Sequence, residues 1–187
     1  MILPLFIITL IVAGIVAWIA ERSNPNLSRW ISVLALSLNF ILAIILWIEQ
    51  NDMVNSENTS WIVKYTLQWI PAFGISISLA LDGLSLLMLL LTFLLGILAV
   101  LTSWKEIQYR IGFFHFNLLW VLAGITGVFL TMDLFLFYFF WEVMLIPMYF
   151  LIGIWGSENR IYASYKFFIF TQASGLLMLL SIIGLYY

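Results

Sequence analysis

The chain has 187 residues, of which 65% are hydrophobic and only 9% are charged, whereas a soluble domain carries about 25% charged residues. Its net charge of −2 comes with no basic stripe, so we expect no nucleic-acid partner. The absence of cysteine and the presence of one histidine exclude disulfides, thiolate metal sites, iron–sulfur ligation and a histidine pair for a haem. We therefore expect an integral membrane protein in which any electron transfer occurs on another subunit.

Long apolar runs predict an all-α integral membrane protein, a bundle of about six transmembrane helices that forms a single membrane domain over residues 1–187. No basic residues precede the first run, so we expect an uncleaved anchor and not a signal peptide there. The predicted spans lie at about 1–20, 30–48, 82–103, 113–132, 134–155 and 167–187.

The period changes between the second and third spans. From Trp61 to Trp69 apolar residues occupy the odd positions, and Ile75–Leu79 alternates in the same way after the turn residues Pro71–Gly74. The pattern predicts a short β-hairpin at about 61–79 on the membrane surface, with its aromatic residues toward the headgroups or a neighbouring subunit. The alternative is an irregular interfacial loop.

Several polar and small residues have structural explanations. Asp82 is placed to cap the third span, and Asn39 is expected to form a helix–helix hydrogen bond. Gly124 and Gly127 give a small-residue face for close helix contact. His115, at the start of the fourth span, either receives protons from the aqueous phase or serves as a polar anchor at the interface.

Basic residues fall mainly in alternate loops, which predicts the orientation of the chain. Three loops hold the pairs Arg22 and Arg29, Lys105 and Arg110, and Arg160 and Lys166, whereas the other two share only Lys64. We expect the three basic loops to face the cytoplasm, and both termini and the hairpin to lie on the non-cytoplasmic side.

The fifth span, within Asp133–Trp155, carries Glu142 near its middle. A charged carboxylate at that depth costs roughly 3 kcal/mol, so Glu142 is the first candidate for a functional residue. Pro147 supplies no N–H to the Val143 carbonyl and is expected to bend the helix beside the carboxylate. Helical spacing places Tyr138 and Tyr149 on or near the same face, where their hydroxyls can solvate it through waters. The alternative is a neutral Glu142 that only hydrogen-bonds a neighbouring helix.

A carboxylate held away from water is a switchable proton carrier when it can meet or lose a basic partner. Lys166 is expected to extend to the cytoplasmic interface. It lies roughly 20 Å from Glu142 along the membrane normal, so only a chain of waters can connect the two groups.

The segments DLFLFYFFWEVMLIPMYFLIGIWG and KFFIFTQASGLLML, together with FNLLWVLAGITGVFLTMD and LDGLSLLMLLLT, resemble the antiporter-like membrane subunits of respiratory NADH:quinone oxidoreductase (complex I), of the chain M or subunit 4 type. The resemblance covers essentially the whole chain. It extends to the related multi-subunit cation/proton antiporters.

The resemblance implies that Glu142 takes part in proton translocation, with Lys166, Tyr138, Tyr149, Pro147 and His115 as possible relay or supporting residues. It implies a subunit of an oxidoreductase that works as a translocase, with NADH, flavin, iron–sulfur clusters and quinone bound on other subunits. The expected partners are the lipid bilayer and the other membrane subunits of complex I, especially neighbouring antiporter-like subunits. A bacterial inner membrane is the expected location.

The family pairs this glutamate with a lysine on a later, broken helix, and the present sequence ends before such a helix. We therefore expect the chain to be an N-terminal portion that holds spans one to six. Two alternatives stay open: a component of a multi-subunit cation/proton antiporter, and a truncated scaffold that transports nothing and in which Glu142 only satisfies a neighbour.

Overall fold

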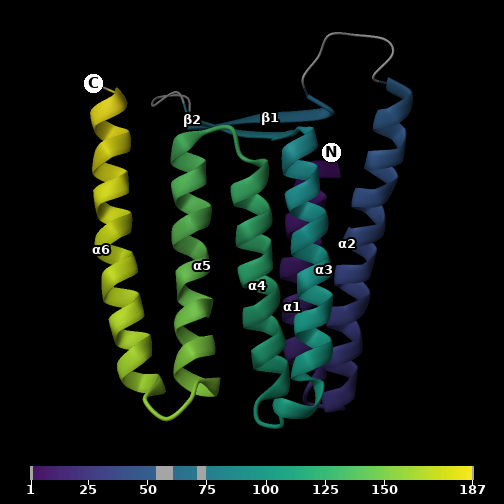
Figure 1. The fold of residues 1–187 in the computed structure, drawn as a ribbon, viewed down its shortest axis with the longest axis vertical. Coiled ribbons are helices and arrows are strands. Elements are labelled where there is room, and N and C mark those ends of the chain that lie inside the picture. Colours follow the sequence, from purple (N-terminus) through teal and green to yellow (C-terminus); the bar gives the residue numbers. More distant parts are fainter. Residues whose placement is uncertain (1, 54–60, 71–74, 187) are drawn as a thin grey trace.

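The computed structural model describes residues 2–53, 61–70 and 75–186. Over these residues six helices stand side by side as a bundle, and a two-stranded sheet lies across one end of it (Figure 1). Each helix is long and apolar enough to cross a membrane, which confirms the predicted all-α membrane fold with one surface hairpin. The helices are α1 (Ile2–Ala20), α2 (Pro25–Met53), α3 (Gly83–Glu106), α4 (Ile111–Leu130), α5 (Leu134–Trp155) and α6 (Arg160–Tyr186).

Aspartate side chains fix the beginnings of two helices. Asp82 precedes α3 and accepts a hydrogen bond of 2.8 Å from the Ser85 backbone N–H, which confirms the predicted cap. Asp133 does the same for α5, accepting from the backbone N–H groups of Phe135 and Leu136. Such bonds satisfy backbone donors that have no partner inside the helix.

Two helices begin earlier than the apolar runs suggest. The helix α2 starts at Pro25, before the predicted span 30–48, and proline is tolerated in the first turn of a helix. As a result Arg29 is a buried helical residue, and its guanidinium donates to the Ile107 carbonyl at 3.0 Å. The helix α6 starts at Arg160, before the predicted span 167–187. Hydropathy marks the apolar part of a helix, whereas the hydrogen-bonded backbone continues into the interface.

The core of the bundle lies among α1 to α4. Phe6 of α1 stacks on Phe93 of α3 with ring centroids 5.7 Å apart, and both rings are fully buried. Asn39 of α2 is also fully buried and accepts a hydrogen bond of 3.0 Å from the Thr9 hydroxyl of α1, so the predicted helix–helix bond is confirmed. By contrast α6 stands at the edge beside α5 (Figure 1).

Close packing of α4 on α5 depends on the predicted small-residue face. Gly124 and Gly127 are buried against α5, and a Cβ atom on either one would meet a neighbour at less than van der Waals distance, Met144 for the first and Phe140 for the second. Lipid chains are as apolar as the helices, so contact of this kind, and not a hydrophobic effect, holds membrane helices together. The helix α5 is therefore positioned by α4.

The hairpin consists of β1 (Val63–Ile70) and β2 (Ile75–Leu81), which pair in antiparallel register with Val63 opposite Leu81. The predicted turn at 71–74 lies outside the described residues. The Trp69 ring is exposed and packs edge-on against Phe139 of α5 at 5.9 Å, and the expected direction of the hairpin's aromatic residues stays a prediction. The turn between α4 and α5 is tied to the hairpin, because the Met132 N–H donates to the Ser78 carbonyl at 2.9 Å.

Figure 1 shows that the connections α1–α2, α3–α4 and α5–α6 lie at one end of the bundle. These connections hold the three pairs of basic residues or lie next to them. The hairpin lies at the opposite end, together with the start of α1 and the end of α6. The charge asymmetry read from the sequence therefore corresponds to two distinct ends of the bundle.

Candidate functional site

The helix α5 carries Glu142 at membrane depth. It is eight residues beyond Leu134 and thirteen before Trp155, so a rise of 1.5 Å per residue places it about 12 Å and about 20 Å from the helix ends. Its side chain is half-buried. Water at the membrane surfaces therefore reaches this carboxyl only through a path inside or between the helices.

The two carboxyl oxygens of Glu142 differ in their surroundings. Oε1 is shielded from solvent and has no hydrogen-bond partner among the described residues. It lies against α6 at Gly175, where a Cβ atom would overlap Oε1. A polar atom that is buried without a partner costs free energy, and the cost is greater when the group is charged. The arrangement therefore suits a neutral carboxyl or one that gains a donor from elsewhere.

A groove of about 350 Å³ runs between α5 and α6 beside Glu142. Most of its wall is apolar, and Tyr138 and Gln172 are the polar residues that line it beside Glu142. Tyr138 lies one helical turn before Glu142 on α5. The lining residues are Phe135, Tyr138, Phe139, Glu142, Val143, Leu145, Ile146, Phe168 and Gln172.

Pro147 adds a backbone acceptor to the same region. The helix α5 continues unbroken through this proline, which has no N–H to give to the carbonyl of Val143. That carbonyl therefore lacks its usual intrahelical donor, and Val143 is one of the residues that line the groove. The bend expected at Pro147 stays a prediction.

The other candidate residues do not line the groove. The Tyr149 ring packs edge-on against Tyr165 and Phe168, at 5.8 Å and 5.6 Å. Lys166 is exposed, with its ammonium 5.7 Å from the centre of the Tyr162 ring. Neither residue is brought to the carboxyl of Glu142, and their support for it stays a prediction.

His115 belongs to the core of the bundle and not to the groove. Its imidazole is only 1% exposed, and its Nδ1 atom has no hydrogen-bond partner among the described residues. The proton-relay role and the anchor role both stay predictions for this residue. Over the described part of the chain, no group of three or more His, Asp or Glu side chains is arranged to hold a metal ion.

Two residues beside Glu142, Gln172 and Gly175, were not predicted from the sequence to belong to the site. Polar and small residues within the sixth apolar run give a weak signal, because a polar residue inside a transmembrane helix is uncommon. The sequence does not show which face of α6 meets α5, so the partner of these two residues was not predictable.

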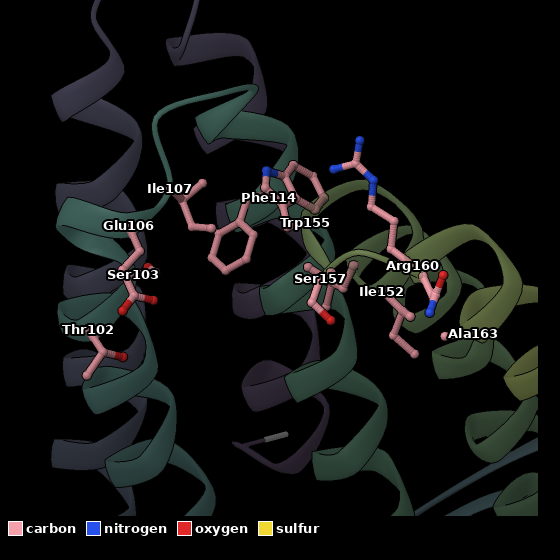
Figure 2. A pocket seen from close by; sticks show the side chains of 13 residues that line it. Thr102, Ser103, Glu106, Ile107, Phe114, Ile152, Trp155, Ser157, Arg160 and Ala163 are labelled. Carbon is pink, nitrogen blue, oxygen red and sulfur yellow. The ribbon is translucent and has the colours of Figure 1, made fainter.

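A larger crevice of about 570 Å³ lies at the basic end of the bundle. Figure 2 shows Thr102, Ser103 and Glu106 of α3 on one side of it, with Trp155 and Arg160 near the α5–α6 connection on the other. The Arg160 guanidinium donates a hydrogen bond of 2.7 Å to the Ile154 carbonyl. None of the candidate residues lines this crevice.

Several known proteins similar to this chain are named as subunits of NADH-quinone oxidoreductases. Residues 131–187 match the family described as NADH:quinone oxidoreductase/Mrp antiporter, TM. The NADH-quinone oxidoreductase subunit M of Pseudomonas aeruginosa is 54% identical over 194 residues, which cover 99% of this chain and 38% of that protein. The subunit of the same name from Escherichia coli strain K12 is 50% identical over 192 residues, with coverage of 99% and 38%.

The fold agrees with these relatives. A chain in the solved structure of respiratory complex I from Thermus thermophilus with bound NADH matches with a TM-score of 0.79 and 28% identity, over 98% of this chain and 35% of that chain. The present chain thus spans 38% of the length of its two bacterial relatives. Over almost its whole length it is a multi-pass membrane chain similar to the N-terminal part of the antiporter-like subunit M of NADH-quinone oxidoreductases.

Proposed function

We propose that the chain is the N-terminal portion of a proton-translocating membrane subunit of a respiratory NADH:quinone oxidoreductase, and that Glu142 carries the proton. The observation that supports this is the Glu142 carboxyl itself. It lies at membrane depth, one of its oxygens is buried without a hydrogen-bond partner among the described residues, and a groove lined by Tyr138 and Gln172 runs beside it. Ionisable groups inside membranes are commonly part of ion or proton pathways.

The surrounding groups suit a carboxyl that alternates between two protonation states. Protonated Glu142 is neutral and is compatible with the apolar walls of the groove. Ionised Glu142 needs donors, which the Tyr138 hydroxyl, the Gln172 amide and waters in the groove can supply. No lysine or arginine lines this groove among the described residues. A counter-charge for the ionised state would therefore come from another part of the subunit, as it does in the family that the sequence resembles.

The whole-enzyme activity follows from the relatives as part of this proposal. NADH, flavin, iron–sulfur clusters and quinone would be bound on other subunits, and this chain would contribute to the proton path. Its neighbours would be other membrane subunits, particularly antiporter-like ones. The basic end of the bundle would face the cytoplasm of a bacterial cell, with the hairpin and both termini on the opposite side.

The decisive experiment replaces Glu142 with glutamine in the full-length gene product in its native membranes. Glu142→Gln keeps the size and polarity of the side chain but removes the titratable group. We expect NADH-driven acidification of inverted membrane vesicles, followed with a pH-sensitive dye, to fall by about tenfold or more. Glu158→Gln, the same change at an exposed carboxyl in the α5–α6 connection, is the matched control. Normal acidification by Glu142→Gln would refute the role of Glu142.

A cation/proton antiporter component is the second candidate, because the description of the matching family also covers Mrp antiporters. The proton chemistry at Glu142 would be the same, without a redox partner. Purification of the tagged protein from mild detergent separates the two candidates. Redox subunits with NADH oxidation activity in the eluate would support the oxidoreductase, whereas antiporter subunits alone would support the second candidate.

A further inference from the structure

The helix α6 reaches the carboxyl of Glu142 with backbone and not with a side chain. Gly175 is buried, and the nearest atoms to a Cβ built on it all belong to Glu142, with Oε1 overlapping the added atom and Cδ at 3.2 Å. Any other amino acid at this position would occupy the space that the carboxyl now fills. The glycine is therefore needed for the observed position of Glu142, provided that the two helices keep their spacing.

This contact is local to one point along α6. Gly184 lies further along the same helix, and a Cβ atom on it would have nothing within 4 Å. A change from glycine to alanine is therefore sterically harmless at one position and not at the other. The two positions share the same helix and the same gain in helix propensity, so they form a matched pair.

The contact also makes the two oxygens of the carboxyl unequal. Oε1 is sealed between α5 and the α6 backbone, without a hydrogen-bond partner among the described residues. Glu142 also lines the groove together with Tyr138 and Gln172, and Oε2 is the oxygen farther from α6, at 3.9 Å from a Cβ atom built on Gly175. Waters or hydroxyls in the groove can therefore exchange a proton with Oε2 more directly than with Oε1.

We propose that Gly175 is a positioning residue for Glu142: its bare backbone holds Oε1 against α6 and directs Oε2 toward the groove, where the proton is exchanged. This inference rests on the proposed role of Glu142 in proton transfer. An added methyl group would push the carboxyl away from α6 and turn it out of this orientation. Displacements of about 1 Å in reacting groups lower rates by up to about a hundredfold.

The test is a cycle of Gly175→Ala, Glu142→Asp and the double variant, with Gly184→Ala as control, in the full-length gene product in its native membranes. Gly175→Ala should lower NADH-driven vesicle acidification by about tenfold or more, and Gly184→Ala should leave it unchanged. Aspartate is shorter than glutamate by one methylene, about 1.5 Å. Glu142→Asp should therefore lower acidification much less in the Gly175→Ala background than in the protein that retains Gly175. The double variant should also acidify the vesicles more than Gly175→Ala alone.

Normal acidification by Gly175→Ala would overturn the inference, and so would equal losses from Glu142→Asp in both backgrounds. If Gly175→Ala does not accumulate in the membrane, accumulation of the double variant becomes the measurement. If Glu142→Asp restores the accumulation of Gly175→Ala in the membrane, the contact is supported, and if accumulation is not restored, the inference is overturned.

The thermal unfolding midpoints of the same proteins in detergent test the contact without reference to transport. Suppose that Glu142→Gln acidifies vesicles normally, while Glu142→Asp raises the unfolding midpoint of Gly175→Ala. The proposed function would then be wrong, but the contact between Gly175 and Glu142 would be supported. If Glu142→Gln is inactive but Gly175→Ala changes neither the acidification nor the unfolding midpoint, only the inference about Gly175 is wrong.

Discussion

Replacing Gly127 with alanine should destabilise the bundle by separating α4 from α5. A Cβ atom at this position would lie 2.5 Å from Cγ and 2.6 Å from Cε1 of the Phe140 ring, whereas carbon atoms in contact are about 3.5–4.0 Å apart. The ring must therefore retreat by about 1 Å or the helices must separate. Overpacking of this kind costs about 1–3 kcal/mol, and in a membrane no hydrophobic effect between helices compensates the lost contacts.

The intrinsic helix preference of alanine works in the opposite direction and must be subtracted. Alanine is favoured over glycine by about 1 kcal/mol in a helix. Gly184→Ala isolates this gain, because a Cβ atom there has nothing within 4 Å. We expect the free energy of unfolding of Gly127→Ala to be lower than that of Gly184→Ala by about 1–3 kcal/mol. For a chain of this size the difference corresponds to roughly 2–4 °C in the unfolding midpoint per kcal/mol.

The assay is thermal unfolding in detergent, followed by the fluorescence of the chain's tryptophans. A second variant, Gly127→Ala with Phe140→Leu, replaces the ring by a smaller side chain and should recover part of the loss. Equal unfolding midpoints for Gly127→Ala and Gly184→Ala would show that the close α4–α5 contact does not limit stability. The reasoning about how α4 positions the helix of Glu142 would then be wrong.

Two further predictions concern side chains that hold elements in place. Asp82→Ala removes the acceptor for the Ser85 N–H and should cost about 1 kcal/mol of stability. The hydrogen bond from Ser85 lowers the pKa of Asp82 below its ordinary value of 3.8, so the stabilisation is complete above that value and is lost as the pH falls through the lowered pKa. Unfolding midpoints measured on both sides of pH 3.8 should show this loss in the native protein but not in Asp82→Asn, and an identical slope in both would contradict it. For the Thr9–Asn39 bond at 3.0 Å, a double-mutant cycle with Thr9→Val and Asn39→Leu should give a coupling of about 0.6–1.7 kcal/mol, and strict additivity would show that the bond contributes nothing.

Much of the fold was predictable, because the features that specify it are local. Runs of about twenty apolar residues can bury their backbone in lipid only as helices, and the alternation from Trp61 to Trp69 has the period of a strand. Asp82 was predictable as a cap from its place before an apolar run. The boundaries of α2 and α6 were less accurate, because helical hydrogen bonding continues into polar sequence where hydropathy gives no signal.

Two residues of the groove, Glu142 and Tyr138, were predictable from the sequence. Glu142 is conspicuous because a carboxylate in an apolar run has a large free-energy cost of insertion, which can be recognised without knowing its neighbours in space. Tyr138 follows from helical spacing on the same element. Tyr149 has equally favourable spacing, yet it packs on Tyr165 and Phe168, because contacts with α6 and not the spacing decide where its ring lies.

The sequence by itself determined that this chain crosses a membrane several times and keeps one acid at membrane depth, since transfer free energies are properties of single residues and short segments. Only the tertiary structure decided that Gly175 closes over one oxygen of that acid and that Gln172 shares its groove. The rotation of α6 about its axis and its distance from α5 fix both contacts. These two quantities result from side-chain packing along the whole interface, which no single stretch of sequence encodes.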